Sequence, residues 1–304
     1  MKILYASDTH VHPAHFSRLL HAGEELLPDA IIVGGDVNPN WRGDIGASIE
    51  PHRTWIRERL LPRLRAFREA RPAIPVFLDL GNDDIAAARN LLEDLDGKDL
   101  HLLHGRVVRI GPQVAVAGYM TVNPTPFAIK DWEKPDCRDR PGLTDPGVAR
   151  SGSVTRSGFP ESFELALSSG TMEEDLESLS DSMRDPGFDG CGFVFVCHAP
   201  PRDSLLDLTG HRVHVGSLAV RRFLEKWSMD GRVLVSLHGH IHESPWESGS
   251  VRDTVGNVPC FNIGQKRQGL RALLFETETP VASARLVTVG PSGELTVMEE
   301  GVWL

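Results

Sequence analysis

The chain has 304 residues, of which 40% are hydrophobic and 24% are charged, and this composition excludes disordered, collagen-like and coiled-coil proteins. Acidic residues outnumber basic residues by 42 to 32, so the formal net charge is -10 and no overall positive field exists to hold a nucleic-acid duplex. An anionic substrate must therefore find positive charge locally.

We expect the protein to be located in the cytoplasm. None of the four cysteines belongs to a C-x-x-C pair, and the first residues, MKILYASD, lack the charged and then apolar pattern of a signal peptide. No apolar run approaches the roughly 18 residues that a membrane span needs. We therefore expect no membrane partner.

Short apolar runs rich in β-branched residues recur along the chain and end abruptly in polar residues or glycine, as buried strands that feed loops do. The expected strands are Lys2–Ala6, Ala30–Gly34, Pro75–Leu80, Val114–Gly118, Gly192–Cys197, Val233–Leu237, Val258–Ile263, Leu273–Glu276, Ala282–Val289 and Glu294–Met298, the last two forming a hairpin. The expected helices are Phe16–Leu27, Trp55–Ala70, Ile85–Leu95, Thr171–Met183 and Ser217–Trp227. In the fourth helix, Thr171 and Glu174 fit a capping box. This order of elements predicts stacked sheets with helices outside.

Residues 121–160 break the alternation, because they hold six prolines and four glycines and show little apolar periodicity. We expect a loop-rich insertion or cap here, within a single domain that spans residues 1–304. Long irregular stretches of this kind are often functional lids, although a mobile surface loop is the alternative. Substrate specificity is expected to reside in this segment.

Polar side chains come directly after five of the expected strands. They are Asp8 and His10, Asp36, Asn82 and Asp83, His198, and finally His238, His240 and His242. Each has a structural explanation when taken alone, such as a turn carboxylate or a hydrogen-bonded core histidine. Together they supply oxygen and nitrogen ligands without thiolates at the carboxyl ends of strands, where ligands bind in α/β sheets. This set is typical of two divalent transition metals such as Mn, Fe or Zn.

The motifs D-x-H, G-D, G-N-x-D, H-A-P-P and G-H-x-H, in this order, resemble the calcineurin-like metallophosphoesterase superfamily over residues 1 to about 265. LHGHIHES at 237–244 and HVGS at 214–217 look most like the branch of predicted phosphoesterases related to the cyclic-nucleotide phosphodiesterase Icc. The resemblance implies an α/β fold, a four-layer αββα sandwich of two mixed β-sheets flanked by helices. It also implies that Asp8, His10, Asp36 and His242 hold one metal ion and that Asp36, Asn82, His198 and His240 hold the other.

The chemistry of such a site explains the residue types. Two metal ions about 3.5 to 4 Å apart share a water, lower its pKa toward roughly 7 and clamp phosphoryl oxygens while the bridging hydroxide attacks in line. The group that bridges both ions must be a carboxylate, which is the role implied for Asp36. Asn82 adds a neutral oxygen, which limits the negative charge next to an anionic phosphate.

The sequence departs from the family at Asp83, because many members carry G-N-H-[DE], and the histidine of that motif is thought to protonate the leaving group. Asp83 donates a proton only if its pKa is raised, and nearby cations act in the opposite direction. The alternative is that Asp83 is a turn carboxylate without a catalytic role. His238 is the histidine of the last motif that we assign to no metal, and three roles stay open for it: orienting a metal ligand, contacting substrate, and simple burial.

We therefore expect a bimetallic phosphoesterase, containing manganese or else iron or zinc, that acts as a phosphodiesterase on nucleotides or small phosphorylated metabolites. One alternative is a protein serine/threonine phosphatase, which is disfavoured because those enzymes carry the G-N-H-E histidine. The other is a non-catalytic binding scaffold on the same fold. It is disfavoured because all seven ligand positions are filled.

Overall fold

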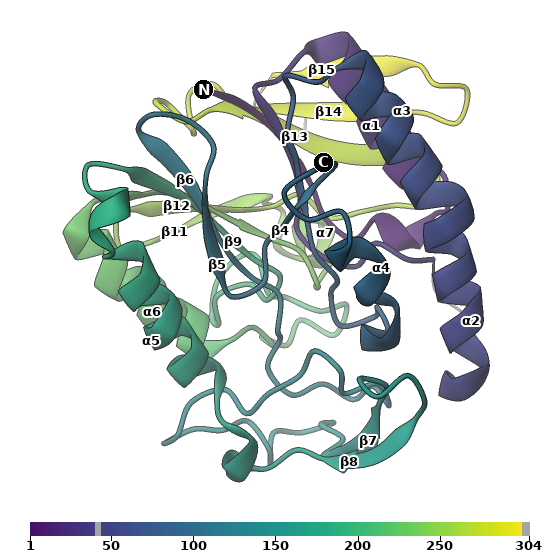
Figure 1. Ribbon diagram of the computed structural model, residues 1–304. Helices are drawn as coiled ribbons and strands as arrows, with labels where there is room; N and C mark the ends of the chain where they lie inside the picture. Colours follow the sequence, from purple (N-terminus) through teal and green to yellow (C-terminus); the bar gives the residue numbers. More distant parts are fainter. Residues whose placement is uncertain (40–43, 300–304) are drawn as a thin grey trace.

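The computed structural model describes residues 1–39 and 44–299, which form two large mixed β-sheets flanked by helices (Figure 1). In spatial order, the seven-stranded sheet consists of β15 (Leu295–Met298), β14 (Arg285–Val289), β13 (Leu270–Glu276), β1 (Lys2–Ala6), β2 (Ala30–Val33), β3 (Val76–Leu78) and β4 (His101–Leu102). The six-stranded sheet consists of β11 (Arg252–Val255), β12 (Val258–Asn262), β10 (Val233–His238), β9 (Gly192–Cys197), β6 (Val114–Tyr119) and β5 (Arg106–Arg109).

Helices cover the outer face of each sheet (Figure 1). On the seven-stranded side lie α1 (His15–Leu26), α2 (Ile45–Trp55) and α3 (Leu61–Ala70), and on the six-stranded side lie α5 (Met172–Met183) and α6 (Leu218–Asp230). The short helices α4 (Asn90–Glu93) and α7 (Ser244–Ser248) belong to connections. The four-layer αββα sandwich expected from the sequence is therefore confirmed. No helix in the described residues is both long enough and apolar enough to span a membrane.

The centre of each sheet is parallel. Strands β1, β2 and β3 pair in parallel, as do β6, β9, β10 and β12. In β1 the side chains of Ile3, Leu4, Tyr5 and Ala6 are all fully buried, as expected for a parallel strand covered on both faces. Because neighbouring parallel strands end at the same edge, the loops after β1, β2 and β3 lie together, and so do those after β9 and β10.

Two helix predictions need correction. The expected helix at Trp55–Ala70 is the second half of a longer helical run that begins with α2, where the Asp44 side chain accepts a hydrogen bond from the backbone N–H of Ala47. The run passes through a wide π-type turn at Ile56–Leu60, next to Pro62, whose nitrogen has no hydrogen to donate. The sequence pattern does not predict α2, because Gly46, Ser48 and Pro51 all have lower helix propensity than alanine or leucine.

The expected helix at Ile85–Leu95 is only a 3₁₀ turn, Ala86–Ala88, followed by the single turn of α4. The backbone N–H of Ala86 donates to Asp131, and that of Ala87 donates to Thr155. Both acceptors lie far along the sequence, so this tertiary contact fixes the start of the segment. The local apolar pattern does not reveal it.

Other local predictions are confirmed. Thr171 and Glu174 form both hydrogen bonds of the capping box at the start of α5, and Met172, Leu176, Leu179 and Met183 are buried. The expected C-terminal hairpin is β14 paired antiparallel with β15.

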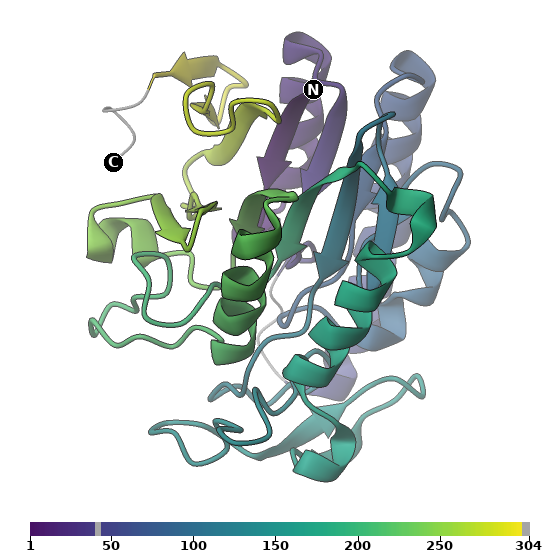
Figure 2. The same ribbon diagram turned by 90° about the vertical axis from the view of Figure 1, so that its left-hand side faces the viewer.

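The segment of residues 120–171, between β6 and α5, is here called the insertion segment. It contains the small two-stranded sheet of β7 (Ser151–Val154) and β8 (Glu161–Glu164), which lies below the two large sheets in both views (Figures 1 and 2). Inside it, the Lys130 ammonium and the Glu133 carboxylate form a fully buried ion pair of 2.8 Å. The Thr125 hydroxyl donates to Glu133, and the Lys130 ammonium donates to the Thr125 carbonyl. Buried polar contacts therefore stabilise this irregular part of the chain.

Candidate metal centre

The loops that follow five parallel strands bring all seven predicted metal ligands together. Those from the seven-stranded sheet are Asp8, His10, Asp36 and Asn82, and those from the six-stranded sheet are His198, His240 and His242. The two groups touch: the backbone N–H of His240 donates to the Asp8 carboxylate (3.0 Å), and Nδ1 of His198 lies 2.7 Å from the Gly34 carbonyl. The candidate site therefore joins the carboxyl ends of both sheets.

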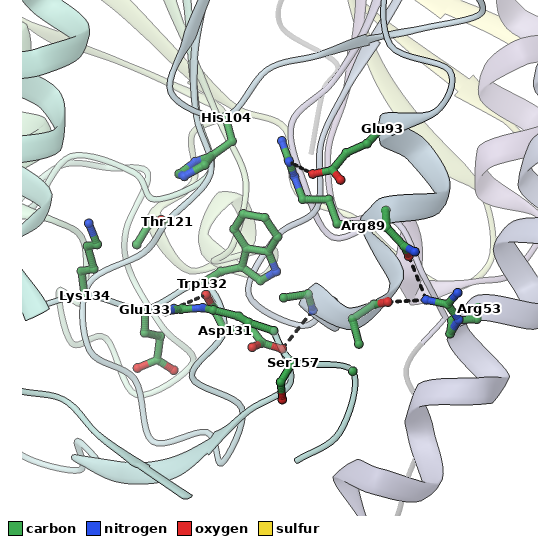
Figure 3. Close-up of a pocket in the computed structure, with 15 residues that line it drawn as sticks. Arg53, Arg89, Glu93, His104, Thr121, Asp131, Trp132, Glu133, Lys134 and Ser157 are labelled. Atoms are coloured by element: carbon green, nitrogen blue, oxygen red, sulfur yellow. Dashed lines mark hydrogen bonds and ion pairs between the residues drawn. The ribbon is translucent and has the colours of Figure 1, made fainter. Parts of the chain in front are cut away.

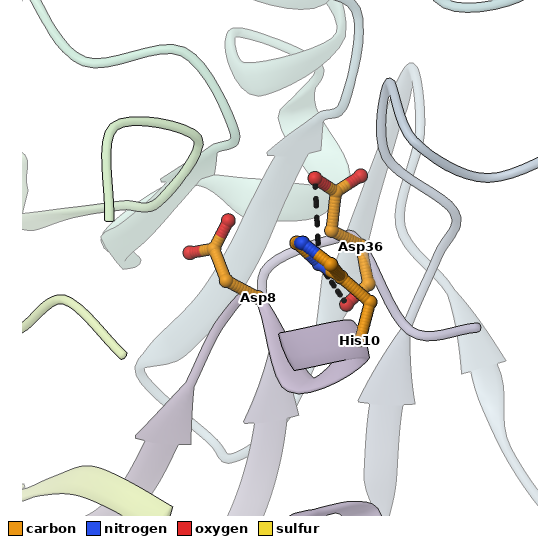
Figure 4. A group of neighbouring side chains, drawn as sticks. All are labelled: Asp8, His10 and Asp36. Atoms are coloured by element: carbon orange, nitrogen blue, oxygen red, sulfur yellow. Dashed lines mark hydrogen bonds and ion pairs between the residues drawn. The ribbon is translucent and has the colours of Figure 1, made fainter. Parts of the chain in front are cut away.

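The tightest cluster consists of Asp8, His10 and Asp36 (Figure 4). Their possible ligand atoms all lie within 4.8 Å of one another, and all three residues are buried. His10 points at Asp36, with its Nδ1 3.7 Å from one carboxylate oxygen. In Asp8, the buried Oδ2 atom has no hydrogen-bond partner among the described residues. A buried acceptor of this kind is costly unless a cation or another donor satisfies it.

His198, Asn82 and Asp36 form the second part of the site. Nε2 of His198 lies 3.0 Å from the Asn82 side-chain oxygen and 3.2 Å from the Asp36 carboxylate. Asp36 thus contacts His10 on one side and His198 on the other. This central position is the one that a carboxylate shared between two cations must occupy.

The last two histidines close the site. The rings of His240 and His198 have centroids 5.5 Å apart, and those of His242 and His10 have centroids 6.0 Å apart. The side chain of His242 is 42% exposed, in contrast to the buried His198. His242 therefore lies at the solvent-facing side of the site.

Backbone strain concentrates at these residues. Asp8, Asp36 and His240 have φ angles of 55°, 53° and 64°, in the left-handed region that few residues other than glycine adopt. Such strain is typical of functional sites, where the surrounding structure holds it in place. Gly81 and Gly239 allow the close approach, because a Cβ at Gly81 would overlap the Asp36 carboxylate and one at Gly239 would overlap Asp8.

The electrostatics favour a cation. Burial disfavours charge on His198, but the adjacent Asp36 carboxylate more than offsets this and raises the pKa of His198 to about 9. Burial likewise opposes charge on Asp36, yet His198 holds the pKa of that carboxyl below its usual range. Burial and the nearby His198 lower the pKa of His240 to about 3, so His240 is a neutral donor at neutral pH. A metal ion held by His198 would require the neutral ring and would compete with this proton.

This geometry agrees with comparisons to known proteins. The family model of the calcineurin-like phosphoesterases matches residues 1–244. The chain belongs to the calcineurin-like phosphoesterase family. The family resemblance inferred from the motifs is thereby confirmed. Among the curated proteins, no significant match exists.

Solved structures of low sequence identity share the fold of this calcineurin-like phosphoesterase. TT1561 of Thermus thermophilus is 13% identical, with 95% of this chain and 98% of that chain covered and a TM-score of 0.54. A dimetal phosphatase from Danio rerio is 12% identical, with 98% of each chain covered and a TM-score of 0.51. At these identities the likeness is one of fold.

Asp83, where the family motif often has histidine, lies beside two predicted ligands. One carboxylate oxygen accepts a hydrogen bond from the Asn82 amide (3.1 Å), and the other lies 3.5 Å from Nε2 of His10. Its backbone N–H donates to Asp36 (2.9 Å). These contacts suit a residue that orients ligands. A catalytic role for Asp83 stays a prediction.

The structure places His238 behind the site, fully buried. Its Nδ1 lies 3.0 Å from the carbonyls of both Cys197 and Ala199, and its Nε2 lies 2.7 Å from the Ser236 hydroxyl. Burial lowers the pKa of His238 to about 4, so the ring is neutral, with its proton on Nδ1. These bonds hold the backbone on either side of His198. They support a positioning role, which is one of the roles that the sequence leaves open for His238.

The structure adds two positioning residues: Asp84, to which the sequence pattern assigns no role, and Asn262, which the sequence indicates only as part of a turn that ends the core. Asp84 is fully buried and accepts hydrogen bonds from the backbone N–H groups of Val37, Asn38 and Gly81 (2.8–2.9 Å), which ties the Asp36 loop to the Asn82 loop. The Asn262 amide donates to the carbonyls of Gly239 and Ile241, on either side of His240. The motif G-N-x-D contains Asp84, so its fixed spacing was the available signal.

Two cavities flank the candidate metal centre. The first, of about 930 Å³ and here called the basic cavity, is lined by His10, Asp83 and His242 together with Lys266 and Arg267. The second, of about 480 Å³ and here called the apolar cavity, is lined by His240 and His242 together with prolines and valines of the insertion segment and of residues 213–215. The site therefore opens in two directions.

A third cavity, of about 560 Å³, contains several cations but none of the predicted metal ligands among the described residues that line it (Figure 3). Its cations are already engaged. Arg89 pairs with Asp79 and Glu93, Lys134 pairs with Asp175, and Arg156 donates to the Asp131 carbonyl. Of these contacts, the pair of Lys134 and Asp175 joins the insertion segment to α5.

Proposed function

We propose that this chain is a metal-dependent phosphodiesterase that acts on nucleotides or small phosphorylated metabolites. The observation that carries the proposal is that seven predicted oxygen and nitrogen ligands from five strand ends lie in one site, with Asp36 between His10 and His198. Family membership adds that phosphoester hydrolysis is the chemistry to test.

The residues fit a pair of divalent cations. Asp8 offers a buried carboxylate oxygen without a hydrogen-bond partner among the described residues, and Asp36 presents its carboxylate between His10 and His198. Carboxylate, amide and imidazole donors without thiolate suit Mn²⁺, Fe²⁺ or Zn²⁺, and we propose Mn²⁺. Asp8, His10, Asp36 and His242 would hold one ion, and Asp36, Asn82, His198 and His240 the other. Such a pair supplies charge neutralisation at the phosphoryl group and activation of a water.

The protein's own residues supply the orientation. Asp84 and Asn262 fix the loops that carry Asp36 and His240, and His238 fixes the backbone around His198. Asp83 orients Asn82 and His10. Because Asp83 replaces the usual histidine, the site favours leaving groups that depart without a proton. Diesters with stabilised leaving groups are therefore better substrates than alkyl monoesters.

Both alternatives are less well supported. A protein serine/threonine phosphatase must protonate a serine or threonine alkoxide, and the G-N-x-D motif lacks the histidine for that step. A binding scaffold without catalysis has no need of strained backbone at Asp8, Asp36 and His240.

The test is metal reconstitution followed by hydrolysis of bis-p-nitrophenyl phosphate. We expect two Mn²⁺ per chain by elemental analysis, and activity that requires added metal. Asp36→Ala removes the shared ligand and is expected to weaken the binding of both ions, whereas His242→Ala empties mainly one position. A stoichiometry below one metal per reconstituted wild-type chain would contradict the proposal. Arg65→Ala, on α3 away from the site, is the control that should retain both metal ions and activity.

A further inference from the structure

The basic and apolar cavities meet at two shared residues, His242 and Phe127. His242 is a predicted metal ligand, and Phe127 belongs to the insertion segment. A phosphodiester carries two ester arms on one phosphorus atom. A phosphate held at the metal centre therefore sends one arm toward each cavity.

The basic cavity favours a negatively charged group. Lys266 and Arg267 are exposed at its wall, and Asp83 is the only carboxylate lining it in the described part of the chain. The buried ring of His52 also lines this cavity, and neither of its nitrogens has a hydrogen-bond partner among the described residues. A buried polar group of this kind gains from a ligand that satisfies it. The backbone N–H of Gln265 donates to the carbonyl of His242, which ties the basic loop to the site.

The apolar cavity favours an uncharged, flat group. Its wall includes Pro124, Pro126, Pro146, Val148, Val213 and Val215. Two of its charged residues already pair with each other: Arg202 lies 3.2 Å from Asp145. An ionic group entering here would lose water without gaining a free partner from that pair.

Phe127 is held in place between the two cavities. Its side chain is 47% exposed and lines both cavities, so a flat group that enters from either side meets this ring. Its backbone N–H donates to the Thr125 hydroxyl, and that hydroxyl donates to Glu133 of the buried ion pair (2.6 Å). These bonds fix the backbone at Phe127, which lowers the entropy cost when a ring stacks on its side chain.

We propose that the substrate is a phosphodiester with an uncharged ring on one arm, stacked on Phe127 in the apolar cavity, and an anionic group on the other arm, beside Lys266 and Arg267. This inference rests on the proposed phosphodiesterase function and adds the substrate class. Specificity then comes from two segments far apart in sequence, the insertion segment and the loop after β12.

The test uses three p-nitrophenyl phosphodiesters with the same leaving group, whose second arm is ethyl, 2-carboxyethyl or 2-(trimethylammonio)ethyl. The nitrophenyl ring serves as the flat arm. We expect kcat/KM at low salt to be about tenfold higher for the carboxyethyl ester than for the ethyl ester, and lowest for the cationic ester. Calorimetric binding of the matching non-hydrolysable phosphonates should give the same order.

Variants separate the two arms. Removing both cations (Lys266→Ala with Arg267→Ala) should bring the carboxyethyl-to-ethyl ratio close to one. Phe127→Ala should lower kcat/KM for all three esters about fivefold or more without changing their ratio, and Phe127→Leu should recover part of the loss. Arg65→Ala, which removes a distant surface cation, should leave the ratio unchanged.

The outcomes distinguish this inference from the proposed function. If the metal-loaded protein hydrolyses none of the three esters, the phosphodiesterase proposal fails. If it hydrolyses all three at equal rates, or if the double variant keeps the wild-type ratio, the two-arm substrate is wrong while the phosphodiesterase proposal stands.

Discussion

Asp84 gives the sharpest test of how the site is held together. Its two carboxylate oxygens accept three backbone N–H groups, with Oδ2 bound to Val37 and Gly81 and Oδ1 bound to Asn38. In Asp84→Asn the single side-chain oxygen can keep two of these bonds. The amide nitrogen of the new side chain then replaces Oδ1, which accepts the N–H of Asn38 at 2.8 Å in the wild type. Two hydrogen-bond donors therefore face each other.

The expected loss of stability follows from the hydrogen bonds that Asp84→Asn removes. Burial and the nearby Asp36 carboxylate raise the pKa of Asp84 to about 7, so the comparison is made at about pH 8.5, where the carboxyl is charged. One hydrogen bond to this charged acceptor, worth about 1.5–3 kcal/mol, is then lost, and one buried N–H is left without a partner at about 1–3 kcal/mol. Allowing for local relaxation, we expect the free energy of unfolding to fall by about 3 kcal/mol. Because the loops carrying Asp36 and Asn82 separate, Mn²⁺ affinity should fall about 10- to 100-fold.

The assays are urea unfolding of the metal-free protein and calorimetric titration with Mn²⁺. The control is Asp185→Asn, which alters an exposed carboxylate that accepts a backbone N–H far from the site and should change stability by less than about 1 kcal/mol. An Asp84→Asn protein that folds normally and binds Mn²⁺ as tightly as wild type would refute the reasoning.

Two further predictions concern Asp83 and His52. If Asp83 only orients its neighbours, Asp83→Asn should change kcat/KM on nitrophenyl diesters by less than tenfold, under about 1.4 kcal/mol of barrier, whereas a loss of about 10²-fold confined to poor leaving groups would make this carboxyl the proton donor. Burial lowers the pKa of His52 to about 4, below the roughly 6.5 of an unfolded chain. Its contribution to stability is therefore complete above pH 6.5 and is lost as the pH falls toward 4, by up to about 3 kcal/mol. Urea unfolding of wild type and His52→Gln at pH 7.5 and 4.5 should show this difference, and an equal difference at both pH values would contradict it.

The sequence by itself determined the strands and the chemistry at their ends. Buried parallel strands are short, continuous apolar runs, and the residues that follow them, such as Asp8 and His198, are read without knowing any tertiary contact. The capping box at Thr171 is equally local, because both of its hydrogen bonds join residues three apart. Parallel strands bring such ends to one edge, so the candidate site was predictable as a group.

Only the tertiary structure decided which contacts position the candidate site residues and where the cavities for the two proposed ester arms lie. The acceptors of Ala86 and Ala87, two of the three donors to Asp84 and the two carbonyls bound by His238 come from distant parts of the chain. The position of Phe127 depends on the buried pair of Lys130 and Glu133. The composition of this segment predicts only a proline-rich loop and does not reveal the pair. Contacts of this kind depend on which side chains meet after folding, and local periodicity carries no information about them.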